Sequence, residues 1–335
     1  MGATRDKQPW SLVVWIGLCC LGFALAGAPP NAPPMTTEEI AAIQRGLDRI
    51  VESTRAWQRE RGDLGLPWDQ ATGHLAIVID DVGRELHLFE QLVDLRFPLT
   101  FSVLPGSVYA AGVQLRLRAD RRRPREILLH LPMEPTDAAQ MQAGAEAQES
   151  FLRQGDPPEL LRAKLEAALD RVPTAIGTNN HMGSRLTPDC DAMAALMPVL
   201  RERGLFFLDS RTIATTCALQ AAQAAGVPVL ARQVFLDDDP TPAAIAAQLD
   251  RAAALARQGP VVAIGHPSPA MVEILRRRLP ELLAEGVAVV PVTALLRHRA
   301  VAPMAGTPAA VAPPAVAPPV AADDPSRQGS GEHRR

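Results

Sequence analysis

The chain has 335 residues, which is enough for one large domain or two smaller ones. Its 34 Lys and Arg against 37 Asp and Glu give a formal net charge of −3, so no basic field favours nucleic acid as a partner. Aromatic residues make up 4% of the chain, which argues against a long stacking platform for sugars.

Residues 1–28 have the pattern of a secretory signal peptide or an N-terminal anchor. Arg5 and Lys7 precede an apolar stretch over residues 10–26 that ends in Ala-Leu-Ala. An uncleaved anchor is the alternative, because the stretch is close to the lower limit for a membrane span. Both interpretations predict a periplasmic or other extracytoplasmic location.

Outside that segment the chain has two cysteines, Cys190 and Cys217. An exported compartment permits a disulfide between them. The spacing leaves open whether they are bridged, because a bridge needs the two Cα atoms within about 7 Å.

Residues 29–72 read as a Pro-rich linker followed by an amphipathic helix. Thr36 and Glu39 form a capping-box pattern at its start. Apolar positions then recur at steps of three and four along one narrow seam: Ile40, Ile43, Leu47, Ile50, Thr54 and Trp57. The seam is shorter than three heptads, so we expect it to pack on the following domain. The alternative is that residues 40–57 recruit an envelope protein or a second copy of the chain.

Over residues 73–298 short apolar runs alternate with helical patterns. The predicted strands are residues 75–79, 99–104, 127–131, 174–177, 205–208, 229–236, 261–265 and 287–292. The predicted helices between them are residues 84–95, 158–171, 189–203, 241–258 and 270–285. Repeated βα units indicate a mostly parallel α/β sheet, open or closed. Polar residues follow most of the strands, which favours a distorted β/α barrel of about seven parallel strands.

Residues 299–335 have a different composition from the preceding domain. Residues 301–322 are almost wholly Ala, Pro and Val, and a polar, charged end follows. Because large apolar residues are missing, this tail is predicted to be disordered.

Paired acids and three histidines stand at the ends of the predicted strands. Asp80 and Asp81 end the first run, His130 ends the third, His181 follows the fourth, and His266 ends the run at 261–265. The carboxyl ends of parallel strands meet on one face, so these side chains are expected to share a site. The alternative for Asp80 or Asp81 alone is a helix cap.

This residue set suits metal-assisted hydrolysis. Two imidazoles and one carboxylate are a sufficient protein ligand set for a catalytic zinc, with a position left for water. Hydrolysis also needs a base and an acid, and a spare carboxylate and a spare histidine are present.

Seven motifs resemble the divergent polysaccharide deacetylase family, which is related to the NodB-like carbohydrate esterases. They are LAIVIDDVG, LTFSVLPG, EILLHLPMEP, IGTNNHMGSRLT, GLFFLDSRT, QVFLDDD and VVAIGHP, in family order between residues 75 and 296. The resemblance implies a distorted NodB-like β/α barrel, a divalent metal, commonly zinc, and removal of acetyl groups from a glycan.

Carried over residue by residue, the resemblance implies that Asp80 is the base and Asp81 a metal ligand. The NodB-like pair of histidines four residues apart is here His130 and Glu134, so the missing imidazole is assigned to His181. His266 matches the late histidine that acts as the acid.

Further polar residues are assigned to the substrate or to support of the ligands: Glu134, Asn180, Arg185, Asp209 and Arg211. For each of these a purely structural hydrogen bond or ion pair is the alternative. Asp237, Asp238 and Asp239 are interpreted as a solvated loop before the helix that begins at Thr241.

The resulting expectation is an exported, metal-dependent glycan deacetylase acting on peptidoglycan or another envelope polysaccharide. The alternative is a non-catalytic envelope protein that binds glycan on the same fold. The glutamate at position 134 favours the binder, whereas the adjacent acids Asp80 and Asp81 favour an enzyme.

Overall fold

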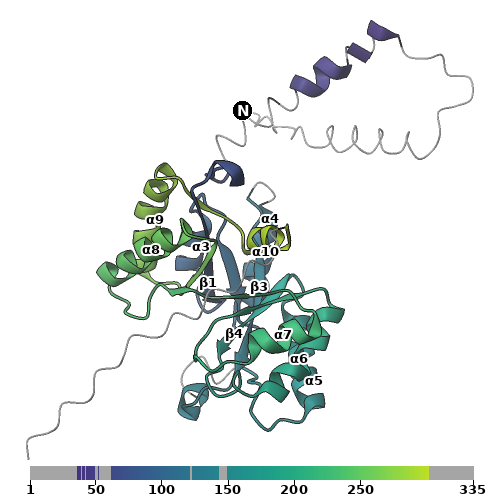
Figure 1. Cartoon of the computed structure of the whole chain (residues 1–335), viewed down its shortest axis with the longest axis vertical. Helices are drawn as coiled ribbons and strands as arrows, with labels where there is room; N and C mark the ends of the chain where they lie inside the picture. Colours follow the sequence, from purple (N-terminus) through teal and green to yellow (C-terminus); the bar gives the residue numbers. More distant parts are fainter. Residues whose placement is uncertain are drawn as a thin grey trace, which may run out of the picture.

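The apolar run that begins at Leu75 forms the central strand of a parallel sheet. A computed structural model describes residues 36–38, 40–41, 43–49, 52, 62–120, 123–142 and 149–301 (Figure 1). In it, residues 75–79 of β1 (Gly73–Val82) are completely buried, because strands on both sides and helices cover them. β1 pairs in parallel with β2 and β8, and its first residues also pair with β9.

The strands follow one another around a curved sheet in the order β6-β5-β4-β3-β2-β1-β8-β7. Their bounds are β2 (Thr100–Val103), β3 (Ile127–Met133), β4 (Gly177–Met182), β5 (Phe206–Asp209), β6 (Val229–Ala231), β7 (Val234–Phe235), β8 (Val261–Gly265) and β9 (Val287–Val289). Only Arg232 and Gln233 separate β6 from β7, so one bent segment pairs first with β5 and then with β8. The predicted barrel of about seven parallel strands is confirmed, with β6 and β7 sharing one position.

Helices cover the outside of this sheet. Their bounds are α3 (His87–Val93), α4 (Ala110–Ala119), α5 (Pro158–Arg171), α6 (Cys190–Glu202), α7 (Ala218–Ala225), α8 (Pro242–Ala256), α9 (Pro269–Ala284) and α10 (Val292–Val301). In Figure 1, α3, α8 and α9 lie on the side of β1, whereas α5, α6 and α7 gather beside β4. Side-chain oxygens of Asp189, Thr241 and Ser268 cap α6, α8 and α9, which explains why these helices begin close to the predicted residues.

Alternate residues of the strands enter two separate apolar clusters. In β1, Leu75, Ile77 and Ile79 pack against the outer helices, whereas Ala76 and Val78 point to the inner side of the sheet. The inner cluster also contains Leu128 of β3, Leu208 of β5 and Ile264 of β8. This alternation follows from the two-residue period of a strand, and it decides which polar residues reach the site.

The amino-terminal end of the barrel is covered by α10. Backbone N–H groups at its start donate to Thr100 and Glu126, which lie at or beside the first residues of β2 and β3. Trp68 stacks between the rings of His74 and His298, with ring centroids 3.6 Å apart on each side. These contacts leave the carboxyl ends of the strands as the face available for chemistry.

Several predicted boundaries are wrong. The strand predicted at 174–177 is β4, which runs from Gly177 to Met182, because its buried polar residues are hydrogen-bonded and do not need to be apolar. The run at 287–292 contains β9 and the first residue of α10. Helices α4 and α10 were not predicted, and α7 was predicted only by its end at Gly226.

Within the amino-terminal region, the described residues between 37 and 49 are helical, as the seam predicted. Ile40, Ile43 and Leu47 are about half exposed, so the expected packing of these three on the barrel is not present. The remaining seam residues, the signal or anchor segment and the tail after residue 301 lie outside the described residues. Among the described helices, none has the length and apolar character needed to cross a membrane.

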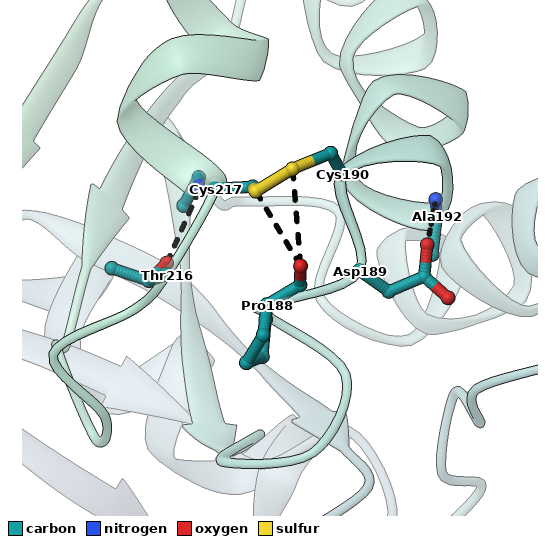
Figure 2. The surroundings of a disulfide bond; sticks show 7 residues. Pro188, Asp189, Cys190, Ala192, Thr216 and Cys217 are labelled. Atoms are coloured by element: carbon teal, nitrogen blue, oxygen red, sulfur yellow. Dashed lines mark hydrogen bonds between the residues drawn. A yellow bond between two sulfur atoms is a disulfide. The ribbon is translucent and has the colours of Figure 1, made fainter.

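A disulfide joins Cys190 and Cys217, with their Cα atoms 5.1 Å apart. Figure 2 shows that it links the start of α6 to the residue before α7, beside Pro188. The two cysteines are 27 residues apart in sequence, so the bond closes a loop that contains α6, β5 and the connection to α7.

Candidate active site

A layer of polar residues crosses the inside of the barrel near the carboxyl ends of the strands. Asp80, His130 and Ser210 each follow an inward-facing residue by two positions, namely Val78, Leu128 and Leu208, and Asn179 is paired in register with His130. The layer consists of Asp80, Ser102, His130, Asn179 and Ser210, all of them buried. By the same count, His266 follows Ile264 at the end of β8. The two-residue strand period therefore brings the predicted base and acid to one face.

Asp81, His130 and His181 form a compact cluster, which we call the ligand set. Oδ1 of Asp81 lies 3.2 Å from Nε2 of His130 and 3.0 Å from Nδ1 of His181. The two ring nitrogens are 3.2 Å apart. The predicted set therefore converges on one point.

Asn179 determines which nitrogen of His130 faces the cluster. Its amide nitrogen donates to both oxygens of Asp80, at 2.9 and 3.1 Å, so its amide oxygen must face the other way. That oxygen accepts a hydrogen bond from Nδ1 of His130 at 2.9 Å and another from the hydroxyl of Ser102. In neutral His130 the lone pair of Nε2 then points at Asp81 and His181.

Three electron-rich atoms thus face one another at about hydrogen-bond distance. Oδ1 of Asp81 is buried and lacks a hydrogen-bond donor of good geometry, while Arg84 holds the other oxygen at 2.9 Å. Added protons or a cation must offset this concentration of lone pairs. A tetrahedral zinc with ligand bonds of about 2.0–2.2 Å separates its ligand atoms by about 3.3–3.6 Å. The observed 3.0–3.2 Å is slightly tighter, and the donor set fits such an ion.

The backbone of this region is strained. Asp81, Met182 and Arg211 have φ of 57°, 54° and 49°, in the left-handed region that residues other than glycine rarely adopt. All three lie at the carboxyl ends of strands, on β1, on β4 and just after β5. Each such residue costs about 1–3 kcal/mol, and strain of this kind concentrates at functional sites.

The charge state of Asp81 follows from its neighbours. Burial alone would raise the pKa of its carboxyl group. The close approach of the His130 and His181 imidazoles outweighs burial and lowers that pKa well below its usual value. At neutral pH Asp81 is therefore a carboxylate.

His266 is oriented by Asp237, so the interpretation of Asp237 as part of a solvated loop is wrong. Both carboxylate oxygens lie 3.3 Å from Nδ1 of His266, and one accepts its backbone N–H at 2.8 Å. Burial would lower the pKa of His266. The hydrogen bond with Asp237 and the charges of Asp81, Asp80 and Asp237 instead raise it to about 9. At neutral pH this imidazole is positively charged and can donate a proton.

Glu134 and Arg185 lie outside the ligand set. Oε2 of Glu134 accepts the backbone N–H of Gln154 at 2.7 Å, and its backbone oxygen accepts from Arg185 and Leu186. The Arg185 side chain donates to Gln154 and is about half exposed. These contacts tie the loop after β3 to neighbouring loops, which is the structural alternative raised for Glu134.

Asn180, Asp209 and Arg211 shape the ends of β4 and β5. Asn180 donates to the backbone oxygen of Met182 at 2.7 Å and accepts from the N–H of Ser210 at 2.9 Å. Burial raises the pKa of Asp209, although the N–H of Arg211 donates to its carboxylate. Asn180 therefore supports the ends of these strands, while its neighbour Asn179 contacts Asp80 and His130.

The sequence did not predict that Asn179, Ser102, Ser210 or Asp237 would contact the proposed base, ligands or acid, or the residues that hold them. The first three follow from counting inward positions two by two along each strand, a signal that was available once the strand bounds were correct. Asp237 carried no such signal, because its contact with His266 depends on the pairing of β7 with β8.

The chain is similar to members of one protein family and to a solved structure. The family model described as divergent polysaccharide deacetylase matches residues 77–296. The chain is 36% identical over 239 residues to the uncharacterized protein YibQ of Escherichia coli (strain K12), covering 71% of this chain and 72% of that protein. An uncharacterized protein of Haemophilus influenzae is 37% identical over 236 residues, covering 70% and 80%. The crystal structure of uncharacterized protein ATU2773 from Agrobacterium tumefaciens C58 matches with a TM-score of 0.61 and 26% identity, over 69% of this chain and 92% of that one.

Proposed function

Because the chain belongs to the divergent polysaccharide deacetylase family, we propose that it is an exported, metal-dependent hydrolase that removes acetyl groups from an envelope polysaccharide. One observation carries this proposal. The carboxyl group of Asp80, the cluster of Asp81, His130 and His181, and the imidazole of His266 lie together at the carboxyl end of one barrel. A module that only binds glycan has no need for a base beside a cation site.

The ligand set would hold the divalent ion, with Asp81, His130 and His181 supplying one oxygen and two nitrogens, a combination that zinc favours. A bound zinc ion supplies a Lewis acid beside the two carboxylates. Asn179 holds His130 in the tautomer that a ligand needs, and Arg84 occupies the second oxygen of Asp81.

Asp80 is suited to accept a proton from the attacking water. It is buried, and its two oxygens accept from the Asn179 amide, which fixes the orientation of the carboxyl group. Oδ2 of Asp80 lies 3.6 Å from Nε2 of His130, so the carboxylate lies directly beside the ligand set.

His266 is suited to give a proton to the leaving nitrogen or oxygen of the sugar. Its raised pKa keeps the imidazolium form populated at neutral pH, and Asp237 orients the ring through Nδ1. The charged ring is about one third exposed, so a substrate can reach it.

Export is supported by two features. Residues 1–28 have the charge and apolar pattern of a secretory signal or anchor. The disulfide between Cys190 and Cys217 suits an oxidising compartment such as the periplasm.

The test measures acetate release from acetylated chito-oligosaccharides and from isolated cell wall, with metal content determined on the same samples. Asp80→Asn keeps the size of the side chain but removes the base, so activity should fall about 10²–10⁴-fold with metal retained. Asp69→Asn, an exposed acid at the opposite end of the barrel, is the matched control.

The rival function is a glycan-binding protein that recruits a partner. The exposed apolar side chains of Ile40, Ile43 and Leu47 favour it. Metal-loaded wild-type protein that binds these glycans yet releases no acetate from any of them would support the rival.

A further inference from the structure

A cavity of about 420 Å³ opens beside the proposed active site and is lined mainly by charged and polar groups. Its lining residues are Arg211, Thr212, Arg232, Gln233, Phe235, Asp238, Gln248 and Arg251. The volume lies in the range of about 300–1,000 Å³ that is usual for small-molecule sites. Three guanidinium groups in one cavity are more than the proposed hydrolysis of a neutral glycan requires.

Two contacts connect the cavity to the reacting groups. The Phe235 ring lies 5.5 Å from the ring of His266, measured between centroids. Nε of Arg232 donates to the backbone oxygen of Ser210 at 2.6 Å, and the Ser210 hydroxyl accepts from Asn179, the residue that holds Asp80. A ligand in the cavity is therefore separated from the proposed acid by one side chain, that of Phe235, and from Asn179, the partner of the proposed base, by Arg232 and Ser210.

The Arg232 guanidinium is positioned without being neutralised. It donates to the backbone oxygens of Ser210 and Arg211, which are neutral acceptors, and it lies 4.9 Å over the Phe235 ring. Burial and the charge of Arg211 lower the pKa of Arg232, so the two guanidinium groups repel each other. An anion between them relieves this repulsion.

Nearby carboxylates offset this charge only in part. Asp238 lines the cavity, and the charges of Asp209, Asp238 and Asp80 act on Arg232, yet none of these acids forms an ion pair with a guanidinium group of the cavity. Asp209 accepts the backbone N–H of Arg211, and burial raises its pKa. Among the ion pairs of the described residues, none involves Arg211, Arg232 or Arg251.

We propose that this arginine cavity binds a carboxylate on the glycan, so that the substrate is an acidic polysaccharide whose charged sugar lies beside the acetylated one. The inference rests on the proposed function, because it names the substrate class of the same site. Guanidinium groups match the planar geometry of a carboxylate, and Phe235 offers an apolar face to the sugar ring.

The experiment measures binding to the metal-loaded full chain of two glycans that differ only in charge. One is a glycan strand of alternating N-acetylglucosamine and N-acetylmuramic acid. The other is the same strand with its carboxylates chemically reduced to alcohols. A hyaluronate oligosaccharide, in which a uronic acid supplies the carboxylate, separates the two sources of the charge.

Wild-type protein should bind at least one carboxylate-bearing glycan about tenfold or more tightly than the reduced strand, and the preference should weaken with salt. Arg211→Gln and Arg251→Gln should each lower affinity for that acidic glycan about three- to tenfold and leave the reduced strand unaffected. Arg277→Gln removes an exposed arginine of α9 that does not line the cavity, and it is the matched control. Circular dichroism of each variant confirms folding.

Equal affinity for acidic and reduced glycans, no affinity for either, or arginine variants without effect would each overturn the inference. Its failure is distinguishable from failure of the proposed function, because binding is measured separately from acetate release. If the protein binds an acidic glycan selectively but releases no acetate, the proposed enzymatic function fails and the carboxylate-binding role of the cavity stands. If it releases acetate and binds the acidic and reduced strands with equal affinity, the carboxylate-binding role fails and the enzymatic function stands.

Discussion

Replacing Asp237 by asparagine should move the pKa of His266 from about 9 back toward the ordinary value of 6.5. The variant keeps the size of the side chain and one acceptor oxygen but removes the charge 3.3 Å from Nδ1. A neighbouring opposite charge shifts a pKa by about 1–3 units, and solvent screens a ring that is one third exposed. We therefore expect a fall of about 1–1.5 units.

The direct assay is an NMR titration of the His266 ring, with and without added zinc. A bound cation offsets the pull of Asp81 and Asp80 on His266, so the wild-type value should be lower with metal. The part of the His266 pKa shift that is due to Asp237 should remain both with and without zinc. Asp238→Asn is the matched control, because Asp238 is exposed and does not contact His266.

Two further consequences follow from the sign of the shift. If His266 is the acid, the alkaline limb of the pH–rate profile should move down by the same 1–1.5 units in Asp237→Asn. A pKa raised on folding stabilises the native state fully below about pH 6.5, and this contribution is lost as pH rises through 9. The variant should thus lose more stability at pH 6 than at pH 10. A His266 pKa that stays near 9 in Asp237→Asn would refute the assignment of Asp237 as its orienting group.

Three other predictions concern the metal, the disulfide and the amino-terminal helix. Purified protein should hold about one divalent ion per chain, measured by elemental analysis. Alanine at any member of the ligand set should remove most of this metal, and full metal content in all three variants would show that the set is wrong. Reduction of the Cys190–Cys217 bond should lower the free energy of unfolding by about 3.5 kcal/mol in denaturant titrations, because it releases a constraint on the unfolded chain across 27 residues. An unchanged midpoint would contradict this. Deleting residues 35–59 should leave a folded, metal-loaded core, since Ile40, Ile43 and Leu47 are exposed; a core that unfolds would show that this helix belongs to it.

Much of the site was predictable because strands have a two-residue period and parallel strands end on one face. The run LAIVIDDVG indicated a buried strand with acids at its carboxyl end. β1 covers this run, and Asp80 and Asp81 lie near its carboxyl end as predicted. The same argument placed His130 and His266 at that end of the sheet, whereas the choice of Asp81, His130 and His181 as metal ligands rested on the resemblance to the family. Local hydrophobic pattern determines these features, and it is present in the sequence itself.

The tertiary structure decided what depends on contacts between distant strands. The role of Asn179 requires β4 to lie beside β3, because only then does the Asn179 amide lie between Asp80 and His130. The roles of Asn179 and Asn180 cannot be distinguished until the bounds of β4 are known. The role of Asp237 requires the short strand β7 to pair with β8. The sequence carries little record of such pairings, because a hydrogen bond between residues 49 or 99 positions apart leaves no periodic pattern in either segment. The polar groups that orient the proposed ligands, base and acid therefore became identifiable only when the barrel brought their strands together.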